Sequence, residues 1–440
     1  MPKIVIIQPS HYRSRSDLTV YKSRKRRLVS LTLPYLAALV PPGWDIRLID
    51  EQMTEIDFQT PVDVAAITVW TINSLRAYEI ADGFRRRGIP VIAGGPHTCF
   101  HSEETAEHCD AVGIGEGEHI LRQMLEDAAG GRLRKFYRCA PLASLEGLPL
   151  PRYELLDSRK YVFFKTFAVQ TSRGCPLRCA FCSERFYLGE NYRFRPVGEV
   201  IEELKTTKAR NILFADSNFA GDINHTMELM EALVPLKVRW SSLWPVHLCS
   251  NKEFMDLAQR SGLLHVNIGI ESIDPDGIGE MNKKSNKVRQ YGEILAGLRK
   301  RRISYSLNFI FGLDTEKRGA FESTLRFLHQ NRVPAAYFNI LTPHKGTPLY
   351  ERMKADNRIV DIRHIGRWPG IVCHIKPEHY SPVELEEKVK RMYLDFYNWS
   401  SMLRRLPFPL TKADIASWIM NIRQRRISRS GCMAENFDDF

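Results

Sequence analysis

The sequence predicts an α/β protein with two parallel sheets and a helical C-terminal region. Its 440 residues exceed the length of one typical domain. Short apolar runs alternate with amphipathic stretches in two series, as expected for parallel strands covered by helices. Between the series, Pro141, Pro149 and Pro151 lie in a stretch without helical or strand period. This stretch predicts a linker over residues 141–160.

The first series, residues 1–140, predicts a doubly wound, Rossmann-like domain. One helix is expected over Ser74–Arg87, ending at Gly88, and another after Ser102, a typical N-cap residue. Ligands of such sheets bind at the carboxyl ends of the strands. The expected strands are Lys3–Ile7, Ile46–Asp50, Val62–Val69, Pro90–Gly94 and Ala111–Ile114.

The second series, residues 161–350, predicts a partial (β/α)6 barrel, because six strand–helix units are too few to close an eightfold one. Catalytic groups are then expected at the carboxyl ends of its strands. Residues 351–440 form the helical C-terminal region, expected on the substrate side, with Tyr393, Phe396, Tyr397, Trp399 and the Arg404–Arg405 pair as candidates for setting specificity. The expected strands are Ala168–Arg173, Asn211–Asp216, Val238–Trp244, Leu263–Ser272, Tyr305–Leu313 and Ala335–Thr342.

The net charge of +12 comes from scattered basic clusters, which we interpret as solvated helix ends. No interleaved aromatics or known module indicate nucleic-acid binding. An anionic or membrane-surface substrate stays open. No apolar stretch approaches about 20 residues, and no signal peptide is recognisable, so we expect a cytoplasmic protein.

Three of the nine cysteines, Cys175, Cys179 and Cys182, are crowded into the segment TSRGCPLRCAFCSE after the first barrel strand. Thiolates are soft ligands that suit zinc or iron–sulfur clusters. A structural zinc site normally closes with four ligands, and the next cysteine is only at Cys249. Three ligands on a 4Fe-4S cluster leave one iron open, which favours a cluster that binds a cofactor or substrate.

This C-x3-C-x2-C loop, with Phe181 before its last cysteine, resembles the signature of the radical S-adenosylmethionine (radical SAM) superfamily. The resemblance implies that the three cysteines hold a 4Fe-4S cluster and that the open iron chelates SAM. It also implies an electron donor such as flavodoxin or ferredoxin.

Other strand ends resemble the same superfamily. The implied contacts with SAM are made by Asp216 and Ser217 near the methionine part, Glu271 and Ser272 at the ribose, and Ile310 and Gly312 on the adenine side. A helix-capping role for Asp216 or Asp274 is an equally good interpretation.

A Rossmann-like domain ahead of such a barrel resembles the cobalamin-binding class of radical SAM enzymes, through LPYLAALVPPGWDIRLIDE, VIAGGPHT and GIGEGE. The resemblance implies a corrin held by strand-end residues, namely Thr71, Gly94, Gly95, Gly115 and Glu116. The D-x-H-x-x-G motif for a cobalt-ligating histidine is absent. His97 is expected to hydrogen-bond locally, and cobalamin to bind without a histidine axial ligand. A domain that binds no corrin also fits these observations.

The resemblance implies a methyltransferase that acts on an unactivated carbon of a small-molecule or lipid-like substrate. One alternative is oxidative cyclisation or rearrangement in the same architecture without methyl transfer. A second alternative is a non-enzymatic corrin or cluster carrier, against which the intact cysteine triplet argues.

Overall fold

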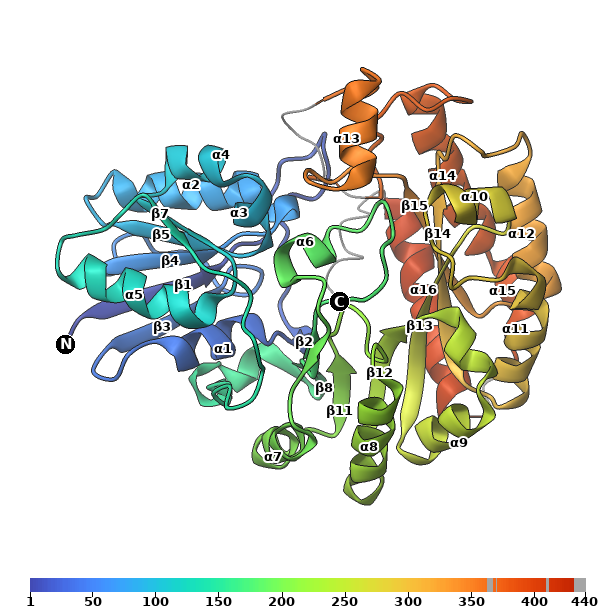
Figure 1. Ribbon diagram of the computed structural model, residues 1–440, viewed down its shortest axis with the longest axis horizontal. Coiled ribbons are helices and arrows are strands. Elements are labelled where there is room, and N and C mark those ends of the chain that lie inside the picture. The colour runs from blue at the N-terminus through green and yellow to red at the C-terminus, as the bar shows by residue number, and fades with distance from the viewer. Residues whose placement is uncertain (362–366, 369, 409–410, 431–440) are drawn as a thin grey trace.

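The computed structural model describes residues 1–361, 367–368, 370–408 and 411–430. It contains two parallel sheets that lie side by side in Figure 1: the first runs from blue to teal, and the second runs from green to orange, with one further strand, Arg26–Val29, in blue. The predicted α/β class, with a partial barrel and a helical C-terminal region, is confirmed. No helix in these ranges is long and apolar enough to cross a membrane.

The first sheet has six parallel strands in the order β3-β1-β4-β5-β6-β7. Helices α1 and α5 pack on one face, and α2 and α4 on the other. The last strand, β7, was not expected, because three residues show no readable alternation. The bounds are β1 Lys3–Gln8, β3 Asp45–Asp50, β4 Val64–Thr68, β5 Val91–Gly94, β6 Ala111–Ile114, β7 Phe136–Arg138, α1 Thr32–Leu39, α2 Ser74–Arg85, α3 Pro96–Phe100, α4 Ser102–His108 and α5 Gly117–Ala129.

The second sheet has seven strands in the order β15-β14-β13-β12-β11-β8-β2, curled into an open half-barrel. The six predicted strands are present, but the first, expected over Ala168–Arg173, spans Tyr161–Val169, and Ser172–Arg173 belong to a separate short strand. The seventh, β2, comes from the segment preceding α1 and pairs in parallel with β8. Its bounds are β2 Arg26–Val29, β8 Tyr161–Val169, β11 Asn211–Phe214, β12 Arg239–Trp244, β13 Leu263–Glu271, β14 Ser304–Phe311 and β15 Ala335–Ile340.

Strand β2 corrects the interpretation of the basic cluster at Arg24–Arg27 as solvated side chains. Arg26 is buried in this strand and its guanidinium pairs with the Asp50 carboxylate, Nη1 to Oδ2, at 2.8 Å. The ion pair compensates for the cost of burying the Arg26 charge. This pairing cannot be recognised from the sequence alone.

Helices cover the outside of the half-barrel and continue into the C-terminal region. A short antiparallel pair, β9 and β10, follows β8 and brackets the cysteine segment. The bounds are β9 Ser172–Arg173, α6 Glu184–Leu188, β10 Arg193–Phe194, α7 Val197–Thr207, α8 Ile223–Leu233, α9 Lys252–Arg260, α10 Pro275–Glu280, α11 Tyr291–Lys300, α12 Ala320–Gln330, α13 Pro348–Ala355, α14 Pro382–Phe396, α15 Trp399–Arg405 and α16 Lys412–Ser430.

The aromatic residues at the end of α14 and directly after it lie in the barrel core and not in a substrate pocket. Tyr393, Phe396 and Tyr397 are buried, and the Tyr397 hydroxyl donates to the Ala336 carbonyl at 2.7 Å. Trp399 is half-exposed on α15. Helical spacing of aromatics therefore reflects core packing here, and α16 is the C-terminal element that reaches the main cavity.

Buried ion pairs join the two sheets. Arg173 of β9 donates to Glu116 at 3.0 Å and to Glu118 at 2.7 Å, both at the start of α5. Arg193 of β10 donates to the other oxygen of Glu116 at 2.9 Å. The end of β6 is thereby fixed against the loop that carries the cysteines.

Candidate active site

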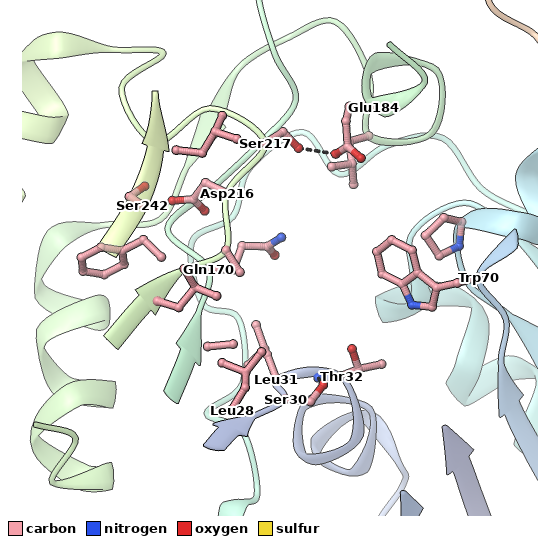
Figure 2. A pocket seen from close by; sticks show the side chains of 18 of the residues that line it. Leu28, Ser30, Leu31, Thr32, Trp70, Gln170, Glu184, Asp216, Ser217 and Ser242 are labelled. Carbon is pink, nitrogen blue, oxygen red and sulfur yellow. Dashed lines mark hydrogen bonds between the residues drawn. The ribbon is translucent and has the colours of Figure 1, made fainter. Parts of the chain in front are cut away.

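A single cavity of about 1440 Å³ lies between the strand ends of the two sheets and continues into the half-barrel. Trp70 points into it from the first sheet, while Gln170, Asp216 and Ser217 reach it from the second (Figure 2). Of the predicted site residues, the cavity is lined by Cys175, Cys179, Phe181, Cys182, Asp216, Ser217, Glu271, Gly94, Gly95, Gly115 and Glu116.

The cysteine loop is fixed at its start and again between its second and third cysteines. Gly174 has φ +84°, and a Cβ at this position would lie 2.2 Å from the Asn191 carbonyl oxygen, so only glycine fits before the first cysteine. Further along the loop, the Ala180 N–H donates to the Met281 carbonyl at 3.0 Å, and the Leu349 N–H donates to the Ala180 carbonyl at 3.1 Å.

The spacing of the three thiols favours a polynuclear group over a single zinc ion. Zn–S bonds of about 2.3 Å bring ligand sulfurs within about 4 Å of one another. Among the described residues, the only His/Cys/Asp/Glu group whose ligand atoms all lie within 4.8 Å of one another contains no cysteine. Burial raises the pKa of all three thiols, that of Cys182 to about 12, and coordination to a metal would favour the thiolate form.

Asp216, at the end of β11, holds the chain that leads into this loop. Its carboxylate accepts from the Thr171 N–H at 2.7 Å, the Thr171 hydroxyl at 2.6 Å and the Ser172 N–H at 2.9 Å. Burial raises the pKa of Asp216 to about 6. Asp216 therefore caps no helix, whereas Asp274 caps α10 by accepting from the Asp276 N–H.

Glu184, two residues after the last cysteine, was not found by sequence reasoning. Its carboxyl group accepts from the Ser217 hydroxyl, as Figure 2 shows, and from the Tyr187 hydroxyl at 2.9 Å. Burial raises the pKa of Glu184, and the hydrogen bonds from Ser217 and Tyr187 offset this rise only in part. These bonds tie α6 to the end of β11.

A buried ion pair lies on the other side of the cysteines. Glu271, at the end of β13, has φ +65°, and its carboxylate lies 2.5 Å from Lys283 Nζ. Burial opposes the charge on Lys283, but Glu271 outweighs it and the pKa of Lys283 stays above its usual value. Lys283 was also missed, because the run MNKK resembles any solvated surface segment.

Four predicted site residues do not line this cavity. Ser272 accepts from the Asp274 N–H at 3.0 Å, and together with Ile310 it lines a smaller, separate cavity of about 430 Å³. The Gly312 N–H donates to Glu316 at 2.8 Å. Thr71 hydrogen-bonds His97 Nδ1 at 3.1 Å. Their contacts with a cofactor stay predictions.

On the first-sheet side, the cavity extends as an apolar slot beneath α1 and α5. Its floor is made of small residues, including Ala66, Gly94 and Gly113. A Cβ on Gly94 would meet no atom within 4 Å. The slot walls are Leu36 and Leu39 of α1 and Ile120, Leu121 and Met124 of α5. This is room for a large organic group.

The other predicted residues at this edge are held by the protein itself. A Cβ on Gly95, at φ +112°, would lie 2.7 Å from the Val69 carbonyl oxygen. A Cβ on Gly115 would lie 2.8 Å from the Cys139 carbonyl oxygen. Both Glu116 carboxylate oxygens bind arginines. Backbone packing and the link between the sheets thus account for these side chains and turns.

His97 is buried outside the main cavity. Its Nε2 lies 2.8 Å from the Tyr78 hydroxyl and its Nδ1 lies 3.1 Å from the Thr71 hydroxyl, residues 19 and 26 positions away, so the expectation of local hydrogen bonds was wrong. His97, His101 and Glu104 form the group whose ligand atoms lie within 4.8 Å. The Arg367 guanidinium pairs with Glu104, and a cation so placed opposes metal binding there.

Comparisons with known proteins agree with this site. Residues 169–328 match the Radical SAM superfamily model. The chain is 28% identical to bacteriochlorophyllide d C-12(1)-methyltransferase of Chlorobaculum tepidum, over 90% of this chain and 89% of that protein.

Two solved structures share the fold. The radical SAM methyltransferase TsrM of Kitasatospora setae, with cobalamin and a 4Fe-4S cluster bound, superposes with a TM-score of 0.63 at 17% identity, covering 81% of this chain and 78% of TsrM. The cobalamin-dependent SAM radical enzyme OxsB gives a TM-score of 0.70 at 14% identity, covering 97% of this chain and 72% of OxsB.

Proposed function

The chain is a radical SAM enzyme, and from this premise we propose that it is a cobalamin-dependent methyltransferase acting on an unactivated carbon of a small molecule. The observation that carries the proposal is the single cavity, which has three thiols at one sheet and a large apolar slot at the other. Two cofactor sites opening on one space suit a reaction that needs both a radical and a methyl group.

In this proposal residues 1–140 bind cobalamin, residues 161–350 bind the cluster and SAM, and residues 351–440 lie on the substrate side. When bound, the cluster and SAM supply a radical that removes a substrate hydrogen, and the corrin supplies the methyl group. A reduced flavodoxin or ferredoxin provides the electron.

The chain's own residues position these groups. Cys175, Cys179 and Cys182 hold the cluster, while Asp216 fixes the backbone leading to them. Lys283 offers a positive charge to the carboxylate of SAM, and Glu271 accepts from its ribose hydroxyls. Both belong to one buried pair, so their charges are already in place before SAM binds.

The slot holds the corrin by shape. Its small floor residues admit the group between α1 and α5, and Trp70 offers an indole face at the end of β4. His97 cannot serve as a lower ligand without breaking its bonds to Tyr78 and Thr71. This supports binding without a histidine axial ligand.

The test is product analysis with anaerobically reconstituted protein, reduced in the presence of SAM, hydroxocobalamin and candidate substrates. We expect about four irons per chain and formation of both S-adenosylhomocysteine and 5′-deoxyadenosine. Replacing the three cysteines by Ala should abolish the cluster and 5′-deoxyadenosine. The matched control, Cys99→Ala, alters a thiol that lines the same cavity from the first sheet and should keep the cluster.

Two outcomes contradict the proposal. Formation of 5′-deoxyadenosine alone, with a substrate that is consumed, indicates cyclisation or rearrangement without methyl transfer. A wild-type protein that binds corrin or cluster but makes neither product is a carrier.

A further inference from the structure

Helix α16 has its polar and apolar faces reversed relative to an ordinary surface helix. Its buried side chains include Ser417, Asn421 and Gln424, while Ile415 and Ile419 are 48% and 53% exposed. The buried face is held by hydrogen bonds: Ser417 to Ser304 of β14 at 2.9 Å, and the Asn421 amide to the Pro334 carbonyl at 2.7 Å. The helix is thus fixed with its apolar face turned away from the sheet.

That apolar face lines the main cavity. The α16 residues that line it recur every three to four positions, as one helix face requires: Lys412, the pair Ile415 and Ala416, the pair Ile419 and Met420, and the pair Arg423 and Gln424. Phe164 of β8, 74% exposed, lines the same end of the cavity. We call this end, made by Phe164, Arg239, Leu264, Lys412, Ile415 and Ile419, the α16 mouth.

The α16 mouth lies at the opposite end of the half-barrel from the cysteines. Leu264 is near the start of β13 and Glu271 is its last residue, and both line the cavity. At about 3.3 Å per residue, these positions are about 23 Å apart. The space is therefore much longer than the methionine or ribose part of SAM needs.

Charge also differs between the ends. Every carboxylate that lines the cavity (Glu116, Glu118, Glu184, Asp216 and Glu271) comes from a carboxyl-terminal strand end or from the segment that follows it, up to the first turn of the next helix. The α16 mouth contributes Arg239 and Lys412, which are exposed and make no ion pair in the part of the chain that the structure describes. An anion is favoured there, and an apolar body is favoured beside it.

We propose that the substrate is an amphiphile that lies along the barrel axis. Its apolar body packs between Phe164 and the α16 face of Ile415 and Ile419, and a carboxylate or phosphate at its far end meets Arg239 and Lys412. This inference rests on the proposed function only in placing the reactive carbon at the cysteine end.

The test is calorimetric titration of the full chain with dodecanoate, dodecyl phosphate and dodecanol, each as monomer. We expect both anions to bind more tightly than the alcohol, and the tighter anion identifies the end group. Ile419→Glu should weaken binding of all three at least about tenfold, because it places a charge against the apolar body. The matched control is Ile422→Glu, an equally exposed α16 residue outside the cavity, which should bind as the wild type does.

The double variant Arg239→Gln/Lys412→Gln should weaken anion binding about threefold to tenfold and leave dodecanol unchanged. Arg429→Gln, on the same helix but outside the cavity, is its control. Equal affinity for dodecanol and both anions overturns the anionic end group. If Ile419→Glu and Ile422→Glu lose affinity for the three ligands to the same extent, the ligands do not pack against the cavity face of α16, and the proposal is overturned. These titrations measure binding and need no turnover. A failure here contradicts the amphiphilic substrate, whereas the absence of S-adenosylhomocysteine in the product analysis contradicts the proposed methyl transfer.

Discussion

The two cofactor sides of the cavity are built in opposite ways. At the second sheet, thiols and carboxyl groups crowd the strand ends, and each carboxylate has a named partner, such as Lys283 for Glu271. At the first sheet, the slot exists because side chains are small or missing, as at Ala66 and at Gly94, where a Cβ would meet no atom within 4 Å. A metal cluster needs donor atoms at fixed spacing, whereas a large organic cofactor needs room. Donor atoms at fixed spacing leave a recognisable motif in the sequence, whereas the need for room does not.

The largest effect is expected from a substitution that fills the slot at the first sheet. Ala66→Phe places a ring in the floor beneath α1 and α5, and we expect cobalamin uptake to fall at least about tenfold because the added volume cannot be absorbed by close-packed walls. Methyl transfer should be lost with it. The measurements are the corrin absorbance of purified protein and the yield of S-adenosylhomocysteine.

Ala66→Ser, which adds only one atom, should keep cobalamin and serves as the control. Iron content and 5′-deoxyadenosine formation should survive in Ala66→Phe, because the cysteine loop belongs to the other sheet. A variant that keeps full corrin uptake contradicts a binding site in the slot.

The same difference explains what the sequence could predict. Cys175, Cys179 and Cys182 were identified by number because their spacing is itself the chemical requirement, and the strands were found because apolar runs alternate. Strand β2 was missed because Arg26 is buried only through its pairing with Asp50, a partner 24 residues away. Lys283 and Glu184 were missed because their roles depend on contacts between elements, which no local pattern records.

The link between the two sides gives the next prediction. Glu116→Gln removes the charge between Arg173 and Arg193, all three of which are buried. Breaking a buried pair leaves an uncompensated charge, so the free energy of unfolding should fall by about 3 kcal/mol. Denaturant unfolding measures this loss, with the exposed Glu126→Gln on the same helix as control.

This variant also separates two roles of Glu116. If the Glu116 carboxylate mainly joins the sheets, the free energy of unfolding falls in Glu116→Gln. The affinity for cobalamin then falls only to the extent that the substitution distorts the slot. Unchanged stability with a lower cobalamin affinity would instead support the predicted cofactor contact. Either result shows which side of the cavity this residue serves.

The smallest expected effect concerns one histidine in each half, the half-buried His265 and the buried His97. Burial lowers the pKa of His265, between Ser304 and Ser306 of the second sheet, to about 4, and holds the pKa of His97 in the first domain well below its usual range. Both rings are neutral in the folded protein but take up a proton in the unfolded chain below about pH 6.5. The free energy of unfolding therefore falls as pH drops below about 6.5, by at most about 1.4 kcal/mol for each ring between pH 6.5 and 5.5.

His265→Asn and His97→Asn should each flatten this dependence, while the exposed His119→Asn should not. Unfolding followed between pH 7.5 and 5.5 measures it. Because the halves are joined by the Glu116 pairs, we expect one transition in which either substitution changes the same pH slope. Two transitions, each responding only to the histidine of its own half, would show that the sheets unfold separately and that the buried ion pairs do not couple them.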